Sequence, residues 1–162
     1  AAALTEVPEV NSSFKGDHIE IYEDLNIGVG TSLEGKGLIV PVVKRAQDLD
    51  LFRLASTLQD LTERARLGKL SQEDVKGGTF SISNHGVSGS LLATPIIINQ
   101  PQAAILGVGK LEKRVVAIEK NGEDIFVAKP MAYITLTIDH RVLDGFQTNM
   151  FLTKFVETLE AF

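Results

Sequence analysis

The chain has 162 residues, of which 44% are hydrophobic and 23% charged, a balance typical of one globular domain. Its net charge of −5 offers no basic surface to a nucleic acid, and no apolar run approaches the ~18 residues that span a membrane, so we expect neither partner. The absence of cysteine excludes disulfides, thiolate nucleophiles and cysteine metal sites, and it is compatible with a reducing compartment.

The N-terminal half predicts a short helix, three strands and one long helix. Residues 1–7 are typical of a helix end, which Pro8 stops. Alternating or continuous apolar runs predict strands at 18–22, 25–30 and 37–44, with Gly35-Lys36-Gly37 as the hairpin turn before the third. From Leu51 to Ala65 the apolar residues recur at helical spacing. Asp48 or Asp50 can cap the start of this helix and Gly68 its end.

The C-terminal half predicts mostly strands, followed by a second long helix. The strands are expected at 79–83, 96–98, 103–109, 114–119, 125–127 and 132–138, and Asn121-Gly122 is a hairpin signal. Residues 146–162 have helical spacing, and Phe151, Phe155, Leu159 and Phe162 could serve the core or an interface. The fold class predicted is therefore α+β, with a mixed sheet and two principal helices.

One segment, Asp139-His140-Arg141-Val142-Leu143-Asp144-Gly145, lies between the last predicted strand and the last helix. A histidine at such a junction is held on rigid elements while its ring can face a cleft, as a general base requires. The alternative is a buried histidine satisfied by a neighbour. Asp144, four residues after His140, could contact the ring or cap the helix, and the sequence leaves both open.

This segment resembles the His-x-x-x-Asp-Gly signature of CoA-dependent acyltransferases. Its longer form resembles the catalytic domain of the E2 component, the dihydrolipoamide acyltransferase, of 2-oxo acid dehydrogenase complexes. Further blocks that resemble this family are Gly77 to Gly86 and Thr94 to Gly107, with weaker similarity at Val7 to Asn11 and Gly37 to Val43. The blocks follow the family's order over nearly the whole chain.

The resemblance implies a chloramphenicol acetyltransferase-like fold, a mixed sheet with flanking helices. It implies that residues 1–162 form a single catalytic domain that lacks the N-terminal part of the usual domain, including a basic segment implicated in CoA binding. Lipoyl domain and linkers are also expected to be absent. The implied partners are two further copies in a homotrimer, a cubic or dodecahedral core, and E1 and E3 components bound through absent domains. The implied location is the bacterial cytoplasm or the mitochondrial matrix.

The resemblance also assigns site residues. His140 is implied to take a proton from a substrate thiol, and Ser83 to donate a hydrogen bond to the oxyanion. The residues alone leave Ser81 and Ser88 as competing hydroxyls. Asn84 and His85 are expected to shape the loop after Ser83 and to contact substrate. Ser83 and His140 are implied to come from neighbouring subunits.

The substrates implied are CoA and a lipoyl group carried by another domain, so both reacting sulfurs belong to substrates. With three scattered histidines and no His-x-x-x-His pair, we expect no metal site. The acyl group stays open, because Ser83 favours acetyl or branched-chain groups whereas the stretch Gly89 to Pro95 favours succinyl. Two alternatives remain: a self-assembling core fragment without activity, and a Ser-His-Asp hydrolase that uses Ser83.

Overall fold

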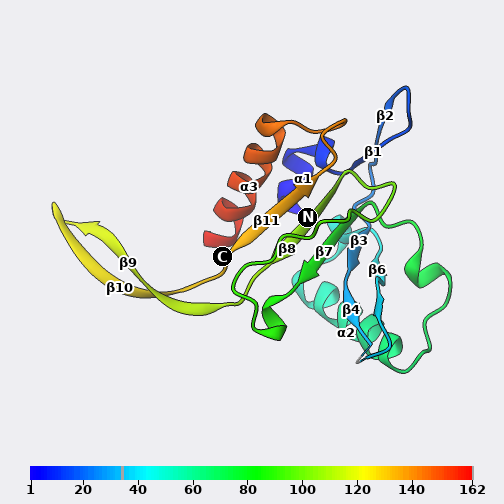
Figure 1. Cartoon of the computed structure of the whole chain (residues 1–162), viewed down its shortest axis with the longest axis horizontal. Helices are drawn as coiled ribbons and strands as arrows, with labels where there is room; N and C mark the ends of the chain where they lie inside the picture. Colours follow the sequence, from blue (N-terminus) through cyan, green and yellow to red (C-terminus); the bar gives the residue numbers. More distant parts are fainter. Residues whose placement is uncertain (34, 162) are drawn as a thin grey trace.

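The computed structural model describes residues 1–33 and 35–161, and its centre is a five-stranded mixed sheet with helices packed on one face (Figure 1). The helices are α1 (Ala2–Glu6), α2 (Leu51–Arg66) and α3 (Gly145–Glu160), with 3-10 turns at Pro8–Val10, Ala46–Asp48, Glu73–Val75 and Gly86–Ser88. The strands are β1 (Ser12–Phe14), β2 (Ile19–Ile21), β3 (Ile27–Val29), β4 (Thr31–Ser32), β5 (Leu38–Ile39), β6 (Val42–Val43), β7 (Phe80–Asn84), β8 (Ala104–Val108), β9 (Glu112–Lys120), β10 (Glu123–Met131) and β11 (Ile134–Ile138).

The order of strands in the central sheet is β11-β8-β7-β3-β6. Strands β3, β7 and β8 are parallel to one another, and β11 and β6 pair antiparallel at the two edges. The mixed sheet and the α+β class predicted from the sequence are confirmed.

The two faces of this sheet are covered differently. On one face Phe80 and Leu106 are buried beneath the helices, and the rings of Phe80 and Phe151 of α3 are 5.8 Å apart. On the other face, coil residues before β8 lie across β8 and β11, and Thr135 Oγ1 donates to the carbonyl of Ala93 at 2.6 Å. Gly107 is required here, because a Cβ would lie 2.4 Å from Thr135 Oγ1 and 2.5 Å from that carbonyl oxygen.

Both ends of α2 are set by short-range contacts. Asp50 Oδ1 accepts a hydrogen bond from Arg53 N at 2.7 Å, so Asp50 rather than Asp48 is the N-cap. Gly68 follows the helix with φ +65°, the left-handed conformation that glycine adopts without steric cost.

The β9–β10 hairpin extends away from the rest of the molecule (Figure 1). Its turn is Asn121-Gly122, with φ values of 58° and 82°, as a two-residue hairpin loop requires. The two predicted strands are confirmed, but they are longer than the sequence indicated.

Two predictions about strands differ from the structure. Residues 96–98 form no strand, and Ile96 and Ile97 are 89% and 83% exposed, so the prediction from their apolar run was wrong. The strand expected at 37–44 is interrupted around Pro41, which has no N–H to donate. The short strands β1 and β4 were not predicted. Phe162, expected to serve the core or an interface, lies outside the described residues.

Candidate active site

His140 lies in an exposed turn directly after β11. The turn is anchored on both sides: Asp139 N donates to Ala103 O at 2.7 Å, and Leu143, which is buried, donates its N–H to Asp139 O at 3.0 Å. The imidazole is therefore exposed on a fixed backbone, and the alternative of a buried, satisfied histidine is wrong.

The residues on either side of His140 form an ion pair. Arg141 Nη2 lies 2.6 Å from Asp139 Oδ2, and Arg141 Nε lies 2.9 Å from Asp139 Oδ1. The hydrogen bonds from Arg141 hold the pKa of the Asp139 carboxyl below its usual value. The Arg141 guanidinium also lies over the Phe14 ring, 4.6 Å from its centroid. These contacts hold the turn that carries His140.

Asp144 is the N-cap of α3. Its Oδ1 accepts hydrogen bonds from Phe146 N at 2.7 Å and Gln147 N at 3.4 Å, and Gln147 Oε1 accepts from Asp144 N at 3.1 Å. This reciprocal pair is a capping box. Of the two roles left open by the sequence, capping is confirmed, and within residues 1–33 and 35–161 no hydrogen bond joins Asp144 to the His140 ring.

Ser83 is half-buried on β7, on the sheet face opposite the helices. It lines a cavity of about 240 Å³ whose other walls include Gly30, Leu38, Val40, Ile97 and Asn99. The competing Ser81 also lines this cavity, but it is buried and its hydroxyl donates to Gln102 Oε1 at 2.6 Å, and Ser88 lies on an exposed 3-10 turn. Of the three serines, Ser83 therefore has a hydroxyl that is partly shielded from solvent and still accessible from the cavity.

The two residues after Ser83 have different contacts. Asn84 Oδ1 accepts from Gly86 N at 3.0 Å, so its side chain closes the turn. His85 Nε2 lies 2.9 Å from Ser83 Oγ. This second contact was not predicted from the sequence, although residues two apart at the end of a strand share a face.

Strands β7 and β11 run in opposite directions, so their C-terminal ends lie at opposite ends of the sheet (Figure 1). Ser83 is near the end of β7 and His140 directly follows β11, so the two residues lie at opposite ends of the sheet in one copy. Ser83 pairs with Gly107, whereas Asp139, next to His140, bonds to Ala103. Gly107 and Ala103 are four positions apart, about 13 Å along a strand, and β7 and β11 flank β8, about 10 Å apart. One copy cannot bring both side chains to the same reacting atom.

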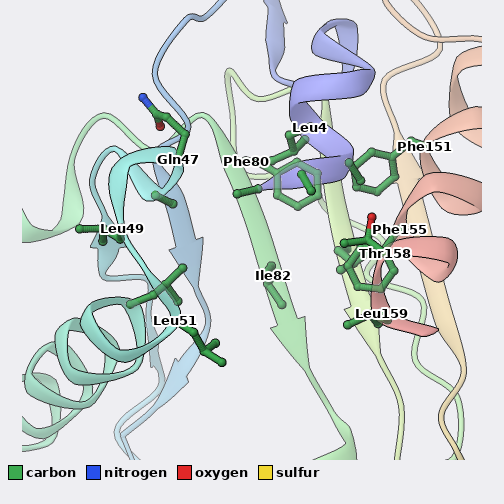
Figure 2. A pocket seen from close by; sticks show the side chains of 16 residues that line it. Leu4, Gln47, Leu49, Leu51, Phe80, Ile82, Phe151, Phe155, Thr158 and Leu159 are labelled. Carbon is green, nitrogen blue, oxygen red and sulfur yellow. The ribbon is translucent and has the colours of Figure 1, made fainter. Parts of the chain in front are cut away.

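A different pocket, of about 330 Å³, lies on the helical face between the sheet, α1, α2 and α3 (Figure 2). Its described lining is mainly apolar, with Phe80, Ile82, Phe151 and Phe155 prominent. None of the described side chains that line it is ionisable, so no side chain there can act as an acid or base in proton transfer.

The sequence profile of the 2-oxoacid dehydrogenase acyltransferase catalytic domain matches residues 1–162. The chain belongs to this family. The family predicted from the sequence is thereby confirmed, and the similar solved structures described next confirm the predicted fold.

Three relatives illustrate the acyltransferase family. A succinyltransferase component of the 2-oxoglutarate dehydrogenase complex from Rickettsia bellii is 47% identical over 161 residues, which are 98% of this chain and 38% of that protein. The dihydrolipoamide acetyltransferase of Azotobacter vinelandii is 34% identical with a TM-score of 0.87, covering 96% of this chain and 63% of that one. A structure of the cubic core of the pyruvate dehydrogenase multienzyme complex is 33% identical with a TM-score of 0.85, covering 93% and 60%.

The chain thus spans little more than a third of the Rickettsia relative and less than two thirds of the two solved chains. In the part that the structure describes, no group of three or more histidine, aspartate or glutamate side chains is arranged to hold a metal ion. Within the same part, no helix has the length and apolarity needed to cross a membrane.

Proposed function

We propose that this chain carries the catalytic residues of a dihydrolipoamide succinyltransferase, which moves a succinyl group between dihydrolipoamide and CoA. Family membership and the name of the Rickettsia relative support this assignment. In the Azotobacter protein a serine, a histidine and an asparagine were investigated for catalytic roles, and its histidine and asparagine are four positions apart, as are His140 and Asp144 here.

His140 is the general base. Its imidazole takes the proton from the CoA thiol, and the thiolate attacks the thioester carbonyl carbon of succinyl-dihydrolipoamide. Ser83 Oγ–H donates a hydrogen bond to the oxyanion that forms. When the intermediate collapses, the C–S bond to dihydrolipoamide breaks and the leaving thiolate receives the proton from His140. A thiol pKa of about 8.5 is close enough to that of histidine for this transfer.

The observation that carries the proposal is the separation of Ser83 from His140 within one copy. His140 is exposed and Ser83 is half-buried, and if both act on one substrate they must come from two copies. We therefore assign the site to the interface of a homotrimer, and the trimers to a larger core like the cubic one of the similar structure.

The same assignment extends to partners. CoA and the lipoyl group are substrates, the lipoyl group being carried by a lipoyl domain, and E1 and E3 components complete the complex. The compartment would be the bacterial cytoplasm or the mitochondrial matrix. Asn84 would shape the substrate-facing loop, because its side chain closes the turn after Ser83.

The first experiment measures acyl transfer to dihydrolipoamide from succinyl-, acetyl- and isobutyryl-CoA. We expect succinyl-CoA to be the best donor and His140→Ala to lower kcat by about 10²- to 10⁴-fold. A core that assembles but transfers none of the three acyl groups would refute the proposal and favour the scaffold alternative. Ester hydrolysis without CoA would favour the hydrolase.

A second experiment tests the shared site. Ser83→Ala and His140→Ala chains are unfolded together and reassembled at equal amounts. If each site takes Ser83 from one copy and His140 from its neighbour, random mixing restores about a quarter of wild-type activity in a cyclic trimer. If each site lies within one copy, mixing restores none.

A further inference from the structure

The contact between His85 and Ser83 has no part in the mechanism above. His85 Nε2 lies 2.9 Å from Ser83 Oγ, whose hydroxyl is proposed to donate a hydrogen bond to the oxyanion. A side chain at this distance determines where the single hydrogen of the hydroxyl points. The inference that follows rests on the proposed function.

The backbone of His85 is fixed by its neighbours. His85 N donates to Val108 O at 2.9 Å, which continues the β7–β8 pairing past the end of the strand. The next residue, Gly86, packs so closely that a Cβ would lie 2.4 Å from Gly109 O. Ser88 N also donates to His85 O at 3.1 Å. The Cα of His85, from which the imidazole extends, is therefore held in a fixed position beside Ser83.

Two hydrogen-bond arrangements fit the distance. If Nε2 of His85 is unprotonated, it accepts the Ser83 hydroxyl hydrogen, which then cannot reach an oxyanion. If Nε2 carries a proton, it donates to Ser83 Oγ and leaves the hydroxyl hydrogen free. The second arrangement also polarises the hydroxyl and makes it a better donor.

We infer that His85 is a positioning residue whose Nε2–H donates to Ser83 Oγ and directs the hydroxyl hydrogen toward the oxyanion. His85 is exposed, so water can satisfy its other ring nitrogen. The role needs no change in the charge of His85, because the neutral Nε2–H tautomer and the imidazolium both donate.

The kinetic test compares His85→Leu with His85→Gln. Leucine removes the donor, and we expect kcat to fall about fivefold to tenfold while KM for CoA stays the same. Glutamine keeps an N–H near the position of Nε2, and we expect it to retain most of the activity. His18→Leu is the matched control, since His18 is an exposed histidine next to Asp17 before β2, and its kcat should not change.

A spectroscopic test does not depend on turnover. The chain has three histidines, so ¹⁵N-histidine-labelled protein gives three ring signals that single substitutions assign. We expect His85 Nε2 to have the shift of a protonated nitrogen, and Ser83→Ala to alter it.

Three results would overturn the inference: an unprotonated Nε2 on neutral His85, an unchanged kcat in His85→Leu, or a kcat that rises in that variant because the hydroxyl hydrogen is released. Failure of the proposed function has a different signature, the absence of turnover in the wild-type protein. In that case the ring signals still decide whether His85 donates to Ser83.

Discussion

Asp139 and Arg141 form an ion pair across the backbone of His140, with Oδ2 and Nη2 2.6 Å apart. The Asp139 carboxylate is mostly buried, with 12% of its side chain exposed, whereas the Arg141 side chain is 58% exposed. The pair therefore joins the end of β11 to the surface turn and holds the backbone on both sides of the proposed base.

This pair predicts a pH dependence of stability. Hydrogen bonds from Arg141 lower the pKa of Asp139 in the folded protein, so the stabilisation is fully present above the unfolded pKa of about 3.9 and is lost as the pH falls through the folded pKa. We expect Asp139→Asn to lower the free energy of unfolding at pH 7, with the difference from wild type shrinking below about pH 4. Urea denaturation of the wild type and the variant at several pH values measures the difference at pH 7 and its decrease at low pH. A difference that stays constant down to pH 3 would contradict the prediction.

Two substitutions of Asp144 distinguish a role in capping α3 from a role of its negative charge. Asp144→Ala removes the cap of α3 and should cost about 1 kcal/mol of unfolding free energy. Asp144→Asn keeps an equally good cap, so we expect stability and turnover close to wild type. Urea denaturation and acyl-transfer assays on both variants check this. A stable Asp144→Asn variant with greatly reduced turnover would mean that the negative charge itself takes part in the reaction.

Ser81 and Ser83 are neighbours on one sheet face, and we expect their alanine substitutions to have opposite effects on stability and kcat. Ser81→Ala leaves the buried Gln102 Oε1 without its donor and should cost about 1–3 kcal/mol of stability, with kcat nearly unchanged. Ser83→Ala should lower kcat about 100-fold with little loss of stability. Thermal denaturation and steady-state kinetics on the two variants form a matched comparison. Equal losses of kcat would argue against a specific oxyanion role for Ser83.

His140→Ala should lower kcat by about 10²- to 10⁴-fold, the usual contribution of a general base. Because the ring is exposed, we expect the urea midpoint to stay near that of wild type. His18→Ala serves as the control for loss of an exposed histidine. A stable His140→Ala protein with wild-type turnover would exclude His140 as the base.

Much of the fold is predictable where the signals are local. The cap at Asp50, the helix end at Gly68 and the turn at Asn121-Gly122 depend on contacts within a few residues, and all three are found. The prediction at 96–98 failed because a strand also needs a partner, and these apolar residues lie outside the sheet. Pairing between distant strands has no local signature.

By itself, the sequence determined which chemical groups are available and on what local backbone: a histidine at a strand-to-helix junction, an acid four residues later, and serines along one strand. The tertiary structure decided what these groups contact. It directs the Asp144 carboxylate to the N-terminus of α3 and pairs Ser81 with Gln102, 21 residues away. Ser83 lines a cavity, and its hydroxyl oxygen contacts His85. It also separates Ser83 from His140, because strand register and order depend on contacts between residues far apart in the chain.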